Sequence, residues 1–256
     1  MNVALRCDKI TMKFGGLTAV NEFSVDVPEK EIYGLIGPNG AGKTTVFNMI
    51  TGNLQPTSGV VYFKDAPLTG LKPYQIVSLG MARTFQNIRL FSNLTVLENV
   101  LTGFHHKLQY NIISTVLRTP RFSKNEKLMK EMAMELLDRV NLKEHADFKA
   151  SELPYGDRRK VEIARALATG PKLLLLDEPA AGMNPQETLD LMYFIEEIRE
   201  KFDLTIFLIE HDMKFVMNLC RRISVLDHGV KIAEGVPEEI QKNPDVIRAY
   251  LGDIDA

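Results

Sequence analysis

Residues 32–51 read IYGLIGPNGAGKTTVFNMIT, and this stretch decides the fold. Its first five residues are apolar or small, which predicts a short strand buried on both faces. The pattern G-x-x-x-x-G-K-[ST] follows over Gly37–Thr44, and helical sequence continues from Lys43 to Thr51, before Gly52. A strand, a glycine-rich turn and a helix in this order predict a loop that binds phosphate through backbone N–H groups and a helix N-terminus.

Each part of this loop has a predicted role. Its members are Gly37, Pro38, Asn39, Gly40, Ala41, Gly42, Lys43 and Thr44, with Thr45 next. The glycines let successive N–H groups face phosphate oxygens, and Lys43 adds a positive charge for the β- and γ-phosphates. Thr44 would offer a hydroxyl to Mg²⁺, and Thr45 would contact the α-phosphate. The alternative is a glycine-rich turn before an ordinary helix, and the loop alone also suits a kinase, a GTPase or a motor.

Bulk properties are those of a folded protein. The chain has 256 residues, 45% of them hydrophobic and 25% charged, with a net charge of −2, so nothing indicates a nucleic-acid partner. Cys7 and Cys220 match no metal or C-x-x-C spacing and are interpreted as small buried residues in a reduced, cytosolic setting. We see neither a signal peptide nor the roughly 18 apolar residues of a membrane span, so we expect another subunit to cross any membrane involved.

Further strands and helices predict an α/β fold with a parallel sheet. Apolar runs at Leu173–Leu176 and Thr205–Ile209 each end at polar residues, as buried parallel strands do. Helical periodicity lies between the strands, and Ser123 with Glu126 suggests a capping box at a helix start. The clearest helical stripe consists of Met129, Met132, Leu136 and Val140.

We predict one domain over residues 1–256 with an inserted helical subdomain at 87–157, because that stretch contains no comparable strand. Within it, His105 to Arg121 is weakly periodic and suggests a loosely helical excursion.

Polar residues follow two of the predicted strands. Asp177 and Glu178 come directly after Leu173–Leu176, at the strand end where such sheets carry active groups. Asp177 is suited to the Mg²⁺ shell, and Glu178 to orienting and polarising an attacking water. His211 follows the third strand and could hydrogen-bond a γ-phosphate, although a lone histidine is more often structural.

In this order the motifs resemble the ABC ATPase family along nearly the whole chain. The resemblance implies a P-loop NTPase core with a parallel sheet, an N-terminal antiparallel β subdomain and an inserted helical subdomain. It implies ATP and Mg²⁺ as cofactors and Lys43, Glu178 and His211 as catalytic residues. By the same resemblance, Gln86 in the segment RTFQ would touch Mg²⁺, and Phe14 would stack on adenine. Phe14 could instead be a core residue, and Gln86 a surface hydrogen-bonder.

The family's LSGGQ signature is altered in this chain. It reads Leu153, Pro154, Tyr155, Gly156, Asp157. In the family this segment caps the γ-phosphate held by the opposite subunit, whereas Pro154 has neither a hydroxyl nor an N–H. The following residues still predict a helix, and Asn184 stands where the family's D-loop has aspartate. We therefore expect the nucleotide site completed by this signature to be the weaker of two.

These variants are similar to the ATP-binding subunits of branched-chain amino acid importers. That resemblance implies a second, non-identical ATPase, two transmembrane permeases, an extracytoplasmic binding protein, and a place at the cytoplasmic face of the inner membrane. Urea and short-amide importers look similar, so the cargo stays open. A soluble ABC clamp protein would usually carry two cassettes or a coiled-coil insertion, and a GTPase would carry an Asn-Lys-x-Asp motif; we find none of these in the chain.

Overall fold

The computed structural model describes residues 2–104 and 120–251. It contains two compact units. Unit 1 comprises Met1–Gln86, Lys172–Gly182 and Ile195–Ala256, and unit 2 comprises Asn87–Pro171 and Met183–Phe194.

A six-stranded sheet forms the centre of unit 1, with the strand order β10-β9-β3-β8-β7-β6. Its strands are β3 (Ile32–Ile36), β6 (Met81–Arg83), β7 (Leu173–Asp177), β8 (Thr205–Ile209), β9 (Arg222–Asp227) and β10 (Val230–Gly235). Only the β9–β10 pair is antiparallel among these neighbours. Every residue of β3, β7 and β8 is buried, because neighbouring elements cover both faces of the sheet. The predicted α/β fold with a parallel sheet is confirmed.

The N-terminal part of unit 1 forms a separate antiparallel sheet with the order β2-β1-β4-β5. Its strands are β1 (Val3–Phe14), β2 (Leu17–Pro28), β4 (Ser58–Phe63) and β5 (Ala66–Pro67). Buried residues of both sheets and of α1 (Lys43–Ile50) share one apolar core. The rings of Phe47 on α1 and Phe207 on β8 lie 5.1 Å apart within it. This core holds the segment between β3 and α1 against the sheet.

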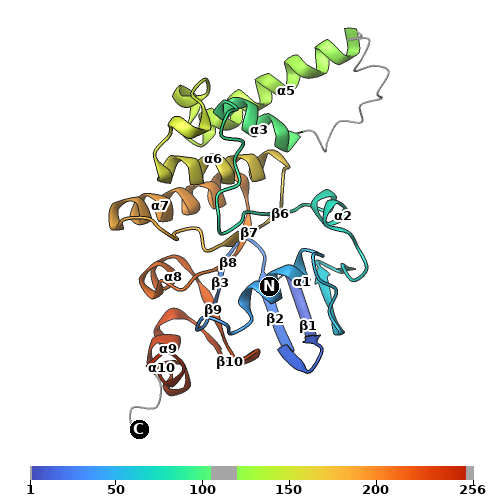
Figure 1. Cartoon of the computed structure of the whole chain (residues 1–256), viewed down its shortest axis with the longest axis vertical. Helices are drawn as coiled ribbons and strands as arrows, with labels where there is room; N and C mark the ends of the chain where they lie inside the picture. Colours follow the sequence, from blue (N-terminus) through green and yellow to red (C-terminus); the bar gives the residue numbers. More distant parts are fainter. Residues whose placement is uncertain (1, 105–119, 252–256) are drawn as a thin grey trace. The chain divides into compact units, whose positions relative to one another are not determined.

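The remaining helices of unit 1 are short, and α9 and α10 lie beside β9 and β10 (Figure 1). They are α2 (Pro73–Ser78), α8 (Met213–Leu219), α9 (Pro237–Lys242) and α10 (Pro244–Leu251). Helix α1 ends at Ile50 with Thr51 as its C-cap, one residue before the predicted end.

Helices make up unit 2, where α3 and α5 pack close to α6 (Figure 1). The elements are α3 (Val96–Phe104), α5 (Pro120–Arg139), the 3₁₀ turns η2 (Lys143–His145) and η3 (Ala150–Glu152), and α6 (Tyr155–Ala168). Helix α7 (Pro185–Phe202) begins in unit 2 and ends in unit 1. The inserted subdomain at 87–157 stays a prediction, and most of the predicted excursion from His105 to Arg121 lies outside the described residues.

Two details predicted for α5 are wrong. The helix begins at Pro120, so Ser123 lies inside it and is not its cap. Met132 is 38% exposed, because the buried stripe passes through Met129, Ala133, Leu136 and Leu137, at spacings of four, three and one. Within the described part of the chain, no helix combines the length and the apolar character that a membrane crossing requires.

Candidate nucleotide site

The glycine-rich loop is held tightly against its neighbours in unit 1. Gly37 and Gly42 have φ angles of 152° and 103°, which L side chains rarely adopt. A Cβ on Gly37 would overlap the carbonyl oxygen of Leu226 in β9, and one on Gly42 would lie 2.6 Å from the carbonyl oxygen of Ala19 in β2. Only glycine fits at these two positions, so packing determines the path of the loop.

Lys43 reaches back into the loop that precedes it. Its Nζ donates to the carbonyl oxygens of Gly37 at 2.7 Å and Pro38 at 2.9 Å, and the residue is 6% exposed. Burial lowers the pKa of Lys43, while the charges of Glu178, Asp177 and Glu210 raise it. The ammonium group therefore lies inside the loop and within electrostatic reach of three carboxylates.

The start of α1 fits an anion. Gly42 is the N-cap, no side chain caps the helix, and its first turn contains no acidic residue. The first N–H groups of a helix lack intrahelical partners and carry a partial positive charge. Thr44 is exposed and Thr45 is half-buried at this end. Together with the Lys43 ammonium, these groups suit the phosphates of a nucleotide.

Three predicted residues come together at the ends of β7 and β8. Gln86 donates from Nε2 to Glu178 Oε2 at 2.8 Å, and His211 Nδ1 lies 3.5 Å from the same oxygen. Glu178 itself has a φ of 44°, and its N–H donates to the carbonyl oxygen of Ile209 at 3.0 Å. Seven other described non-glycine residues also have a positive φ, so the backbone conformation alone does not identify a functional residue. The contacts of its carboxylate with Gln86 and His211 make Glu178 the candidate base.

Sequence reasoning missed Arg83. Its Nη2 lies 2.6 Å from Asp177 Oδ2, and its Nη1 donates to Asn48 Oδ1 at 2.8 Å and to Thr51 Oγ1 at 3.2 Å. Both charged side chains are nearly buried, at 8% and 7% exposure. A charge within the otherwise apolar segment Met81–Arg83 was the available signal, but its partner is set by the pairing of β6 with β7.

Glu210 was missed as well. It is fully buried, and its carboxylate accepts hydrogen bonds from backbone N–H groups in two different loops. In the sequence it reads only as the residue before His211.

Phe14 lies at the end of β1 and is 48% exposed. This exposure rules out the alternative that it is a core residue, while its contact with adenine stays a prediction.

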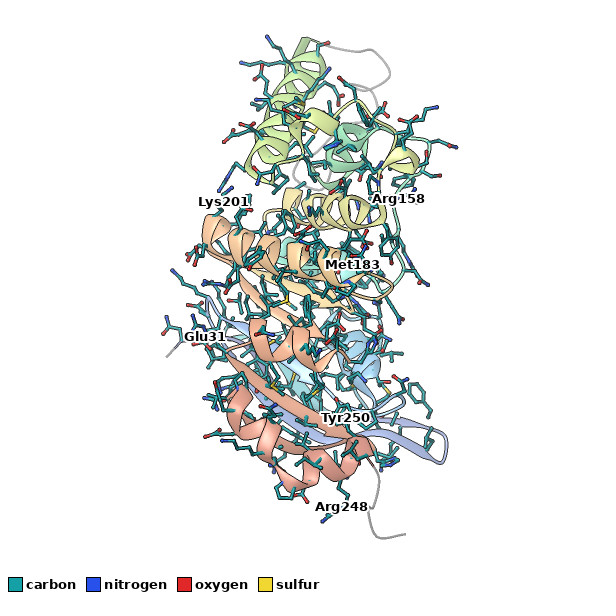
Figure 2. The ribbon with its side chains drawn as sticks, turned by 90° about the vertical axis from the view of Figure 1, so that its left-hand side faces the viewer. Glu31, Arg158, Met183, Lys201, Arg248 and Tyr250 are labelled. Carbon is teal, nitrogen blue, oxygen red and sulfur yellow. The ribbon has the colours of Figure 1, made fainter. Side chains whose placement is uncertain are left out.

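The altered signature lies in unit 2 at the start of α6. Leu153 is buried, Pro154 is the N-cap without a side-chain hydrogen bond, and the helix begins at Tyr155, so the predicted helix is present. Arg158, labelled in Figure 2, donates from Nε to the carbonyl oxygen of Leu153 at 2.8 Å. Asp157 in the first turn pairs with Lys160 at 3.4 Å, which places a negative charge near this helix N-terminus.

The residue in the D-loop position has a structural contact. Asn184 Oδ1 accepts from the N–H groups of Gln186 and Glu187, both at 3.0 Å, and the Asn184 N–H donates to the Glu187 carboxylate. Asn184 therefore caps α7.

The residues fit Mg²⁺ only as part of a nucleotide complex. Among the described residues, no cluster of three or more His, Cys, Asp or Glu could hold a metal. Mg²⁺ is usually bound by one or two carboxylates together with substrate phosphates. The Thr44 hydroxyl, the Gln86 amide oxygen and the Asp177 carboxylate have the oxygen chemistry that such an arrangement would need, and their role as Mg²⁺ ligands stays a prediction.

Comparison with known proteins gives consistent similarities. A model of the family described as ABC transporter matches residues 20–181, and one described as branched-chain amino acid ATP-binding cassette transporter matches residues 230–256. The high-affinity branched-chain amino acid transport ATP-binding protein LivG of Salmonella typhimurium is 50% identical over 97% of this chain and 98% of its own. BraF of Pseudomonas aeruginosa, with the same description, is 47% identical over the same shares. A crystal structure of an ATP-binding cassette of an ABC transporter in its ADP conformation superposes with a TM-score of 0.86 at 33% identity, covering 99% of this chain and all of that one.

Proposed function

Because this chain belongs to the ABC transporter family of ATP-binding proteins, we propose that it binds and hydrolyses ATP to power the import of branched-chain amino acids. The family predicted from the sequence is thereby confirmed. The cargo rests on the relatives described as branched-chain amino acid transport proteins and on the second family model at residues 230–256.

The single observation that carries the chemistry is the position of Glu178. It follows β7 with a strained backbone, and its Oε2 lies between the Gln86 amide and the His211 ring. A carboxylate held in this way can accept a proton from a water molecule whose oxygen attacks the γ-phosphorus, while the bond to the ADP oxygen breaks. General bases of this kind contribute about 10²–10⁴-fold in rate.

The other predicted residues bind and orient the nucleotide. The backbone N–H groups of Gly37–Thr45, except at Pro38, and the Lys43 ammonium would hold the phosphates, with His211 directed at the γ-phosphate and Phe14 stacked on the base. Thr44, Gln86 and Asp177 would hold Mg²⁺, which when bound neutralises charge on the phosphate oxygens.

We also infer the assembly. ABC ATPases of this kind work with transmembrane permeases, and we propose two permeases, a second non-identical ATPase and an extracytoplasmic binding protein. The chain would then lie peripherally at the cytoplasmic face of the inner membrane. The signature of this chain, Leu153–Asp157, would complete the partner's nucleotide site, and that site would be the weaker one because Pro154 has no N–H or hydroxyl to donate.

Reconstitution tests the function and the cargo. We would place the complete complex in proteoliposomes, with ATP inside, and measure ATP hydrolysis together with uptake of labelled leucine, urea and acetamide. We expect leucine uptake that requires ATP, and Glu178→Gln to lower hydrolysis and uptake by about 10²–10⁴-fold while a fluorescent ATP analogue still binds. The exposed Glu238→Gln is the matched control. Uptake of urea or acetamide without leucine would overturn the cargo, and full hydrolysis by Glu178→Gln would overturn the role of Glu178.

The asymmetry has its own test. Glu→Gln is introduced either at Glu178 or at the equivalent position of the second ATPase, and ATP hydrolysis by the two complexes is compared. We expect the Glu178 change to cause the larger loss. Equal losses would refute the weaker second site.

A further inference from the structure

Glu210 is a buried carboxylate at the carboxyl end of β8, with no role in the mechanism above. It is 0% exposed. Burying an isolated carboxylate costs several kcal/mol, so its hydrogen-bond partners must offset that cost. Those partners are therefore the guide to what the residue does.

The carboxylate connects two loops of unit 1. Its Oε1 accepts from the N–H of Ala180 at 2.8 Å, in the carboxylate loop, which we define as residues 178–182. Its Oε2 accepts from the N–H of His211 at 3.0 Å, and the Asp212 N–H lies 3.5 Å away; we call residues 210–212 the histidine loop. Hydrogen bonds to an ionised acceptor are about twice as strong as neutral ones. One side chain thus holds the backbones of both loops.

The two loops connect Glu210 to the candidate base Glu178 and to the N-terminus of α8. Ala180 lies two residues after Glu178, whose φ of 44° depends on the path of this turn. Asp212 is the N-cap of α8, where its Oδ1 accepts from Lys214 N at 2.8 Å and Phe215 N at 3.1 Å. The carboxylate loop, the histidine loop and the start of α8 are therefore joined at Glu210.

The charged and titratable groups near Glu210 are few. His211 Nδ1 lies 3.6 Å from its Oε2, and the Glu210 charge acts on Lys43 and on the Cys220 thiol. Burial raises the pKa of Glu210, while the three backbone N–H groups and His211 lower it. The carboxylate is held mainly by backbone N–H groups, whose positions it therefore determines.

We propose that Glu210 is a positioning residue that ties the carboxylate loop to the histidine loop, so that the neighbouring side chains of Glu178 and His211 keep the relative position that the reaction at the γ-phosphate needs. The inference rests on the proposed roles of Glu178 and His211. It adds that a third, fully buried residue aligns these two groups.

Glu210→Gln tests this proposal. The substituted amide would turn an NH₂ group either toward Ala180 N or toward His211 N, and either arrangement loses an acceptor. We expect kcat for ATP hydrolysis in the assembled complex to fall about 10²-fold, the cost typical of a misplaced reacting group, while KM for ATP and binding of a fluorescent ATP analogue change less than about threefold. Glu210→Asp, one methylene shorter, serves the same purpose if the glutamine variant does not fold.

Residue-resolved hydrogen exchange on the full chain provides a readout independent of activity. We expect the amides of Ala180, His211 and Asp212 to exchange about tenfold faster in Glu210→Gln, while the amides of β7 and β8 keep their protection. The control is Ser224→Ala, which removes a buried hydrogen bond of 2.8 Å to Tyr33, between β9 and β3 of the same sheet. It should leave those three amides unchanged.

A double variant separates positioning from general damage. If Glu210 acts in part through Glu178, the loss of kcat in Glu178→Gln/Glu210→Gln should be smaller than the product of the two single losses. Any of three results would overturn the proposal. These are unchanged exchange at the three amides, a loss of kcat in the double variant equal to the product of the two single losses, and a loss of nucleotide binding along with kcat. If the wild-type complex hydrolyses no ATP, the proposed function fails, whereas the exchange comparison still decides whether Glu210 joins the loops.

Discussion

Replacing Arg83 should show how much its nearly buried ion pair with Asp177 contributes to the free energy of unfolding of unit 1. In Arg83→Met the carboxylate of Asp177 loses a partner 2.6 Å away while its side chain stays about 7% exposed. Breaking a buried pair by removing one member costs about 3–5 kcal/mol, because the remaining charge loses its directly bonded partner. The contacts of Arg83 with Asn48 and Thr51 would be lost as well.

Urea unfolding of the full chain, followed by a probe in unit 1, measures this effect. With a denaturant slope of about 3 kcal/mol/M, the expected loss lowers the midpoint by roughly 1–2 M. A cycle with Asp177→Asn and the double variant separates the pair from other losses, and we expect a coupling energy above about 1 kcal/mol. Lys30→Met breaks a pair of similar length, 2.8 Å, whose side chains are 62% and 59% exposed, and should leave the midpoint close to that of the wild type.

The reasoning would be refuted if Arg83→Met shifted the midpoint no more than Lys30→Met. A coupling energy near zero would also refute the reasoning, because the Arg83–Asp177 pair would then contribute no more than an exposed ion pair.

Three further outcomes follow from particular residues. Gly37→Ala should abolish binding of a fluorescent ATP analogue because the added Cβ meets the Leu226 carbonyl, whereas Gly16→Ala, with open space around it, should bind normally; retained binding in Gly37→Ala would contradict the packing argument. Phe14→Ala should weaken ATP binding by about 1–3 kcal/mol, the typical worth of a stacked base, and Phe14→Tyr should restore it; equal affinities measured by titration for all three proteins would exclude stacking. Burial raises the pKa of both cysteine thiols, so native protein at pH 8 should resist iodoacetamide and react at Cys7 and Cys220 only after denaturation, which mass spectrometry would detect; labelling of either thiol in the native protein would show that it is accessible.

Local patterns of apolar residues in the sequence predicted much of the fold. The strands at 32–36 and 205–209 have the predicted bounds, and the third, Leu173–Asp177, is one residue longer than its apolar run. A buried parallel strand needs a continuous apolar run, and that requirement is visible in a few adjacent residues. Errors arose where the deciding contact is not local, as in α5, where packing and not the sequence pattern determines which residues face α3 and α6.

The phosphate loop was predictable from the sequence because the spacing of its glycines, Lys43 and the helix that follows form one local pattern, although contacts with Leu226 and Ala19 set its path. The sequence also brought Asp177, Glu178 and His211 to strand ends, since strand period and length are local properties. The partners of these groups could not be predicted from the sequence. Arg83 and Asp177 are 94 positions apart and Ala180 and Glu210 are 30 apart. The pairing of β6 with β7 and of β7 with β8, together with the loops that follow β7 and β8, brings them into contact, and no local pattern shows this.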